Sequence, residues 1–124
     1  MEVIRSNKAP AAAGPYSQAV KHKGFVFVSG QIPVDPATGE IPHDIEAQTT
    51  QALKNLSAVL TAAGSGMDKA LRVTVFVSDM SQFATVNGIY AKFFNEPYPS
   101  RTCVESAHLP KGVMIEIDAI AIAD

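Results

Sequence analysis

The last strand-like segment of the chain, residues 113–123, limits the possible folds more than any other feature of the sequence. Its residue types alternate with a period of two, which is typical of a β-strand. One face carries Val113, Ile115, Ile117, Ala119, Ala121 and Ala123, and the other carries Met114, Glu116, Asp118, Ile120 and Ile122. A carboxylate in the middle of an apolar strand is costly to bury unless something pairs with it. Glu116 is therefore the first residue that needs an explanation.

The rest of the chain predicts further strands and two helices. In chain order, we expect strands at 3–5, 16–21, 25–29, 71–78, 101–107 and 113–123. The clearest helix is expected at 44–63, where Asp44 can cap its start. A second helix is expected to begin at Asp79 or Ser81 and to run to about Phe94. This order predicts an α+β fold with a mixed sheet of about six strands and two helices on one face.

Three of the predicted strands, 25–29, 71–78 and 113–123, have apolar residues on both faces. Two helices can cover only one face of such a sheet, and a monomer with so large an exposed apolar surface would be unusual. We therefore expect a homo-oligomer that packs through the open sheet face. The 124 residues suit one domain, 1–124, because the chain contains no linker, repeat or low-complexity tract.

Composition excludes several classes of protein. The apolar fraction of 47% and the charged fraction of 18% are typical of a globular domain. The net charge of −2 argues against a large basic surface for nucleic acid, and no apolar stretch reaches the length of a membrane span. The single cysteine favours a reducing compartment, and the charged start of the chain does not resemble a secretory signal, so we expect a cytoplasmic protein. The three histidines show no metal-ligand spacing, so no metal site is expected.

Arg101 begins the strand predicted at 101–107 and shares a face with Cys103 and Glu105. A planar guanidinium binds a carboxylate through two parallel hydrogen bonds, so we expect Arg101 to hold an anionic substrate beside Glu116. The residue pattern alone leaves other roles open. Arg101 could be a surface ion-pair partner, Glu116 a structural partner in a buried interface pair, and Cys103 a small buried apolar residue.

Several sequence blocks resemble the RidA/YjgF family in their order and spacing, and together they cover nearly the whole chain. The blocks are Gly-Pro-Tyr-Ser-Gln-Ala at 14–19, Val-Ser-Gly-Gln-Ile-Pro at 28–33, Thr-Val-Phe-Val at 74–77, Pro-Ser-Arg-Thr-Cys-Val-Glu at 99–105, Leu-Pro-Lys-Gly at 109–112 and Ile-Glu-Ile-Asp-Ala at 115–119. The resemblance implies a chorismate-mutase-like fold and a homotrimer with its sites in clefts between subunits. Ser106, His108 and Asp118 depart from the family pattern near the predicted cleft, which bears on substrate size.

The resemblance also implies an activity, the hydrolytic deamination of enamine and imine intermediates. Dehydratases that use pyridoxal phosphate (PLP) and act on serine or threonine release 2-aminoacrylate-type enamines, which tautomerise to 2-imino acids. A RidA-like protein hydrolyses the imine to a 2-keto acid and ammonia before it damages PLP enzymes. No cofactor is needed, because a protonated imine is already electrophilic.

The same resemblance gives roles to particular residues. Arg101 would bind the substrate carboxylate, and Glu116 would position and deprotonate the attacking water. The backbone at Cys103 would hold the imine nitrogen. The remaining residues expected at the site are Tyr16, Ser29 and Gly30, which would line the cleft, and Asn87, which matches a family position.

Two other classes of function stay open at this point. Some members of the family are single-stranded ribonucleases that inhibit translation, although this chain has no tryptophan and no basic stripe on which bases could stack. A chaperone-like or ligand-binding role on the same oligomeric scaffold is the second alternative.

Overall fold

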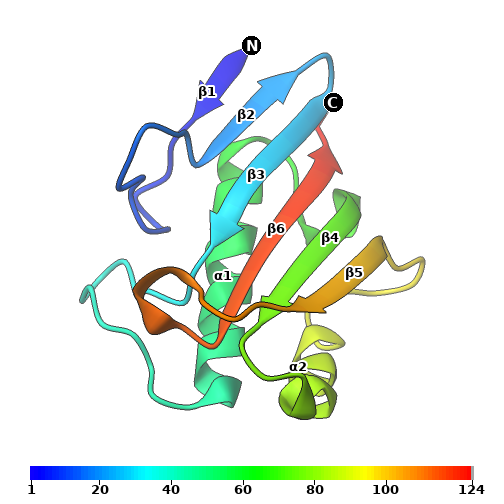
Figure 1. Ribbon diagram of the computed structural model, residues 1–124. Helices are drawn as coiled ribbons and strands as arrows, with labels where there is room; N and C mark the ends of the chain where they lie inside the picture. The colour runs from blue at the N-terminus through cyan, green and yellow to red at the C-terminus, as the bar shows by residue number, and fades with distance from the viewer. Residues whose placement is uncertain (124) are drawn as a thin grey trace.

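The computed structural model describes residues 1–123, which form one six-stranded mixed sheet with two α-helices (Figure 1). In chain order, the elements are β1 (Glu2–Ile4), β2 (Ala19–His22), β3 (Phe25–Gln31), α1 (Ile45–Ala62), β4 (Ala70–Val77), α2 (Phe83–Tyr90), β5 (Ser100–Glu105) and β6 (Ile115–Ile122). Short 3₁₀ turns at Met67–Lys69, Met80–Gln82 and Pro110–Gly112 join some of them. The strand order is β1-β2-β3-β6-β4-β5, and only β4 and β5 pair in parallel. The α+β class with two helices on one face is confirmed.

Helix α1 forms where the sequence predicts it and supplies most of the core beneath the sheet. The Asp44 side chain accepts a hydrogen bond of 2.7 Å from the Ala47 N–H and so satisfies one of the free donors of the first turn. Gly64 follows the helix with φ of +77°, a left-handed conformation that glycine adopts without steric cost. The side chains of Leu53, Leu56 and Leu60 are fully buried against the sheet.

Several predicted boundaries differ from the observed ones by a few residues. Strand β2 begins at Ala19, because the Tyr16 N–H donates to the Gly14 carbonyl and closes a tight turn before the strand. Helix α2 ends at Tyr90 rather than near Phe94, because the N–H groups of Lys92 and Phe93 bond to carbonyls three residues back instead of four and so tighten the turn. The strand predicted at 101–107 ends at Glu105.

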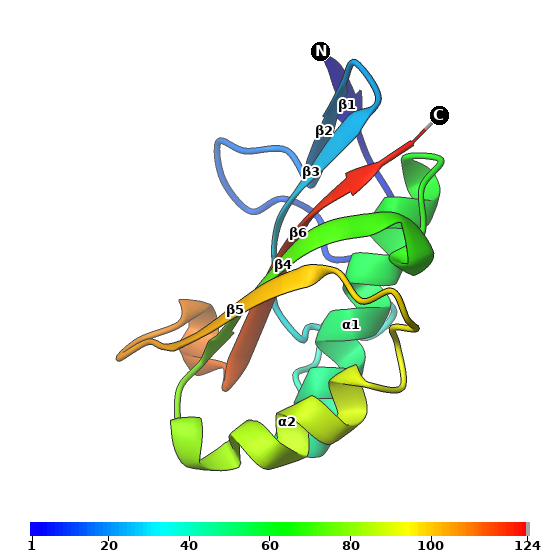
Figure 2. The ribbon, with the colours of Figure 1, turned by 90° about the vertical axis from the view of Figure 1, so that its right-hand side faces the viewer.

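The two faces of the sheet are covered very differently, since both helices lie on the same side (Figure 2). Val26 and Val28 of β3 point to the helices and are buried, whereas Phe25 and Phe27 alternate with them and are each 45% exposed. In the register of the strand pairs, Val3, Val20 and Ile120 lie next to one another or to Phe27 and so point to the same side of the sheet. We call this side the open face. Its apolar character matches the surface expected from the sequence. No helix among residues 1–123 is long and apolar enough to cross a membrane.

Candidate functional site

Glu116 lies at the centre of β6 and points to the open face. Its strand neighbours Ile115 and Ile117 are fully buried on the helix side, so alternation directs Glu116 the other way. The carboxylate packs against the backbone of Gly30 on β3. A Cβ atom placed on Gly30 would overlap the Glu116 carboxylate oxygen and would lie 2.8 Å from its Cδ atom. Glycine at position 30 is therefore what allows the carboxylate to lie against the strand.

A pocket of about 350 Å³ surrounds this carboxylate. Its lining residues, which we call the carboxylate half-site, are Tyr16, Ser29, Gly30, Ile32, Pro110 and Glu116. Ser29 fixes one wall, because its hydroxyl donates to the Ser17 carbonyl at 2.6 Å and so ties the loop that carries Tyr16 to the end of β3. Four residues expected at the site from the sequence, Tyr16, Ser29, Gly30 and Glu116, thus come together in one chain.

The surroundings of Glu116 raise the pKa of its carboxyl group above the ordinary value. Burial is the main cause, and the like charge of Asp118 adds to it. Burial also raises the pKa of Asp118, although hydrogen bonds from Thr74 and the positive charge of Arg72 oppose the shift. The sequence left open whether burial or a nearby arginine dominates at Glu116, and within this chain burial dominates. A carboxylate with a raised pKa is a stronger base, which suits the activation of water.

Arg101 lies on the opposite face of the sheet from Glu116. It pairs in register with Val73, which is fully buried beneath the helices, so the Arg101 side chain emerges on the helix side of edge strand β5. The structure therefore does not place Arg101 beside Glu116 within one chain, and the expected meeting of the two residues in a cleft between subunits stays a prediction. Any contact between these two side chains requires two copies of the protein.

The Arg101 guanidinium rests on helix α2. Its Nη1 donates to Asn87 Oδ1 at 2.7 Å, and its central carbon lies 4.7 Å from the ring centroid of Tyr90 and 5.3 Å from that of Phe83. Residues 83, 87 and 90 follow one another along a single helix face. These contacts orient a charged group that is otherwise exposed, through cation–π attraction and a charge-assisted hydrogen bond. We call Phe83, Asn87, Tyr90, Arg101 and Cys103 the guanidinium half-site.

Cys103 is half-buried beside Arg101 and packs against the core. Burial raises the pKa of its thiol, and the positive charge of Arg101 only partly opposes this shift. A thiol with a raised pKa is a poor nucleophile, so the side chain fits the small apolar residue that the sequence allowed. The substrate contact expected at its backbone stays a prediction.

Sequence reasoning missed four residues of the two half-sites. Ile32 and Pro110 line the pocket beside Glu116, and Phe83 and Tyr90 support Arg101. The spacing of Phe83, Asn87 and Tyr90 on one helix face was a usable signal for the second pair. Ile32 and Pro110 gave no comparable signal, because only the fold brings their loops together. Among residues 1–123, no group of three His, Cys, Asp or Glu side chains is arranged to hold a metal ion.

Comparisons with known proteins agree on one family. The family model described as Endoribonuclease L-PSP matches residues 6–123. The chain is 51% identical to the RutC family protein PH0854 of Pyrococcus horikoshii, over 97% of this chain and 96% of that protein. It is 49% identical to the 2-iminobutanoate/2-iminopropanoate deaminase of Escherichia coli, over 98% of this chain and 97% of that enzyme. The crystal structure of E. coli TdcF with bound serine has a TM-score of 0.95 at 43% identity and covers 100% of both chains.

Proposed function

Because this chain belongs to the RidA/YjgF family, we propose that it hydrolyses small 2-imino acids to 2-keto acids and ammonia. The observation that carries the proposal is the Glu116 carboxylate, which has a raised pKa and lies against Gly30 inside a pocket. A closely similar enzyme is named for this reaction with 2-iminobutanoate and 2-iminopropanoate. Serine bound to the related TdcF structure is also a small acid with a nitrogen on its α-carbon, which fits a site for substrates of this size.

In the proposed reaction, Glu116 acts as a general base on a water molecule. The carboxylate accepts a proton from water while the water oxygen forms a bond to the imine carbon, and the C=N π electrons move to the protonated nitrogen. This step gives a tetrahedral aminoalcohol. The proton held by Glu116 then passes to the amine, the C–N bond breaks, and the Glu116 carboxylate takes up the hydroxyl proton as the carbonyl forms. Ammonia leaves and takes this proton from Glu116, so the proton that the imine carried ends on ammonium and the carboxylate is restored. All atoms of the imine and of one water molecule are accounted for in the two products.

Arg101 is the proposed anchor for the substrate carboxylate, and it would come from a neighbouring subunit. The guanidinium is already oriented by Asn87 and Tyr90, which lowers the entropic cost of gripping a carboxylate with two hydrogen bonds. Because Arg101 and Glu116 lie on opposite faces of one sheet, a complete site needs the open face of one copy to meet β5 of another. The resemblance to the RidA/YjgF family implies a homotrimer, and we propose this assembly for the chain, in the cytoplasm, with one cleft between each pair of subunits.

The substrate of such an enzyme must come from a reaction that releases an enamine. PLP-dependent dehydratases acting on serine or threonine are the proposed source, and the role of the protein is to remove the imine before it attacks PLP enzymes. No cofactor takes part in the proposed hydrolysis, since the protonated imine is itself the electrophile. Ser29, Tyr16 and the backbone near Cys103 are the proposed further contacts to the substrate.

A coupled assay tests the activity. A threonine dehydratase generates 2-iminobutanoate, and the release of 2-ketobutyrate is timed with and without this protein. We expect the protein to accelerate release, and we expect Arg101→Ala to lower kcat/KM about 10- to 100-fold, because a hydrogen bond to a charged group contributes about 1.5–3 kcal/mol. Equal rates with and without the wild-type protein would refute the proposal.

Subunit mixing tests the shared cleft. Glu116→Gln and Arg101→Ala are each expected to have strongly reduced activity, but an equal mixture assembled at random should contain intact clefts. Each cleft takes its carboxylate from one chain and its guanidinium from the next, so about a quarter of the clefts regain both groups. A mixture that stays as inactive as the separate variants would show that the site does not span two chains.

The description of the family model, an endoribonuclease, names a second candidate activity. The net charge of −2 does not favour it, since binding of single-stranded nucleic acid depends on a positively charged groove. RNA cleavage that is lost in Glu116→Gln and falls steeply with salt would support this alternative.

A further inference from the structure

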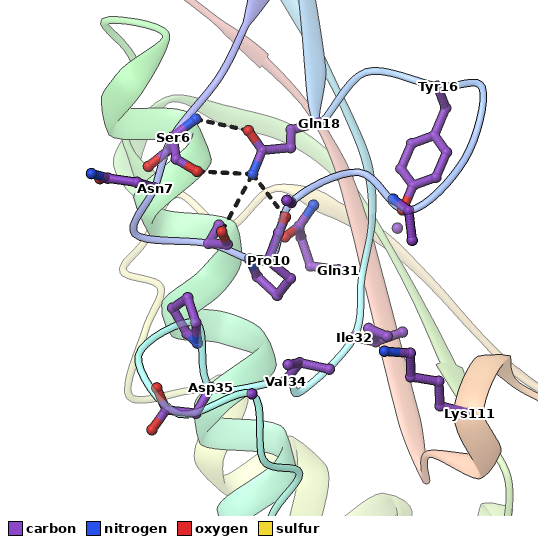
Figure 3. A pocket seen from close by; sticks show the side chains of 16 residues that line it. Ser6, Asn7, Pro10, Tyr16, Gln18, Gln31, Ile32, Val34, Asp35 and Lys111 are labelled. Atoms are coloured by element: carbon purple, nitrogen blue, oxygen red, sulfur yellow. Dashed lines mark hydrogen bonds between the residues drawn. The ribbon is translucent and has the colours of Figure 1, made fainter.

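A second pocket lies directly beside the carboxylate half-site. It has a volume of about 420 Å³ and lies between the N-terminal loop and the loop that follows β3 (Figure 3). Tyr16, Gly30 and Ile32 line both this pocket and the one that contains Glu116. The two spaces are therefore neighbours across these three residues. We call the second space the side pocket.

The walls of the side pocket are mainly apolar. They include Ala9, Pro10, Ala13, Ile32, Val34 and Pro36. Three of the polar side chains among its walls are already engaged with the protein, and Asn7 and the charged Lys111 also line the space. Gln18 bonds to backbone groups of the N-terminal loop, Gln31 donates to the Ser29 carbonyl at 3.1 Å, and Asp35 accepts from the Ala37 N–H at 2.9 Å. The apolar part of this lining favours an aliphatic group, because the ligand gains from burial there and Gln18, Gln31 and Asp35 need no new partner.

The side pocket is also held open by the fold itself. The Gln18 side chain is 5% exposed and holds the N-terminal loop in place through hydrogen bonds to its backbone. Its Oε1 accepts from the Ser6 N–H at 2.7 Å, and its Nε2 donates to the carbonyls of Ser6 and Pro10 at 3.0 and 2.8 Å. Figure 3 shows Gln18 and Pro10 on one side of the space and Tyr16 and Ile32 on the other. A preformed apolar space lowers the cost of binding, because no loop must be ordered first.

We propose that the side pocket binds the aliphatic side chain of 2-imino acids longer than four carbons, with Ile32 at the passage from the carboxylate half-site. This inference rests on the proposed deaminase function and names its substrate class. The reacting carbon stays beside Glu116, and the side chain extends past Ile32 toward Ala13 and Val34. The proposal adds no chemical step, since the same hydrolysis acts on the longer imine.

The test uses a series of 2-imino acids made in place from alanine, 2-aminobutyrate, norvaline and norleucine by an L-amino acid oxidase, with catalase present to remove peroxide. The rate of 2-keto acid release gives kcat/KM for each chain length. We expect kcat/KM to rise from the four-carbon to the six-carbon imine by roughly fourfold for each added methylene, the factor that complete burial of a CH₂ group supplies. If kcat/KM stays constant or falls as the imine grows beyond four carbons, the inference is overturned.

Variants that fill the side pocket provide a second test of the inference. Ala13 is exposed and lines the side pocket, so Ala13→Phe should place a ring in it and lower kcat/KM for the norleucine imine about tenfold more than for the alanine imine. Ala12→Phe is the matched control, because Ala12 is a neighbouring residue that is also exposed and lines a different pocket. Ile32→Phe should narrow the passage and remove the rise of kcat/KM with side-chain length. If Ala13→Phe does not fold, the wild-type series and Ile32→Phe still decide the question.

The outcomes separate this inference from the proposed function. No acceleration with any imine refutes both. If the protein accelerates hydrolysis of the alanine imine but kcat/KM does not rise for longer side chains, only the role of the side pocket is refuted. An equal loss for all chain lengths in Ala13→Phe would also refute it, because the ring would then disturb the site in general.

Discussion

The two faces of the sheet differ in how they are covered. The helix face is buried by the chain itself, whereas the open face is left exposed to solvent. On the helix face, Val73, Ile115 and Leu56 pack in a core with no exposed surface. On the open face, Phe25 and Phe27 are each 45% exposed beside a strand that carries Glu116 and Asp118. The helix face obtains its stability from within the chain. The open face combines apolar surface and perturbed carboxylates, the pattern expected where a second copy packs and a site forms.

The largest effect is expected from a charge placed on the open face. Phe27→Asp should abolish assembly and reduce imine hydrolysis to the background rate, because it places a charge in the proposed interface. The fold of the single chain should persist, since Phe27 is already 45% exposed. Light scattering after gel filtration measures the mass, and the coupled assay measures activity. Ala62→Asp, on the exposed side of α1, is the control and should leave both unchanged. An active Phe27→Asp trimer would contradict the assigned role of the open face.

Removing the carboxylate charge is expected to have the next largest effect. Glu116→Gln should lower kcat roughly 10²- to 10⁴-fold, the usual contribution of a general base, while circular dichroism stays unchanged. The wild-type rate should fall on the acid side as Glu116 becomes protonated. This fall should centre above 4.5, because burial raises the pKa of Glu116 above that value. A variant that keeps full activity would remove Glu116 from the mechanism.

The raised pKa of Glu116 also predicts how the stability of the fold changes with pH. A raised pKa means that the folded chain binds its proton more tightly than the unfolded chain, so the contribution of Glu116 to stability declines as the pH rises from 4.5 through the raised pKa. Thermal melting at a series of pH values measures this. Glu116→Gln should melt at the same temperature as the wild type, or slightly higher, at pH 8, since it carries no buried charge. A clearly lower melting temperature would indicate that Glu116 is a structural ion-pair partner.

A smaller effect is expected from crowding the carboxylate. Gly30→Ala should lower kcat/KM about 10- to 100-fold, because the added Cβ would overlap the Glu116 carboxylate and push it out of position. Circular dichroism and the assembled mass should change little, since the flexible end of Glu116 can move. Gly88→Ala is the matched control, because a Cβ there would have no atom within 4 Å. Unchanged activity in Gly30→Ala would mean that the position of the carboxylate does not matter.

The smallest effect is expected at the support of the guanidinium. Asn87→Ala removes the acceptor that Arg101 Nη1 bonds at 2.7 Å, and the Tyr90 and Phe83 rings remain beneath the guanidinium. We expect KM to rise about 2- to 10-fold with little change in kcat, because one hydrogen bond at an exposed site contributes about 0.5–1.5 kcal/mol. Thr85→Ala, on an exposed part of α2, is the control. A loss confined to kcat would place Asn87 in the chemical step instead.

Much of the fold could be predicted from the sequence because local signals agreed with the tertiary structure. The period of two in 113–123 and the capped apolar stripe of 44–63 led to β6 and α1 within a few residues. Boundaries were missed where short-range hydrogen bonds decided the outcome, as in the turn at Gly14 and Tyr16 and in the tightened end of α2. These bonds compete with pairing or helix continuation over only a few residues, and hydrophobic periodicity does not report them.

By itself, the sequence determined which side chains could carry the chemistry and that one sheet face would lack a cover within the chain. Only the tertiary structure decided that Arg101 and Glu116 lie on opposite faces, and that Gly30 lies against the carboxylate. The physical reason is that strand alternation fixes relative faces only within a strand. The face on which Arg101 emerges relative to Glu116 depends on how β5 pairs with β4 and how β4 pairs with β6, and these pairings join segments far apart in the chain.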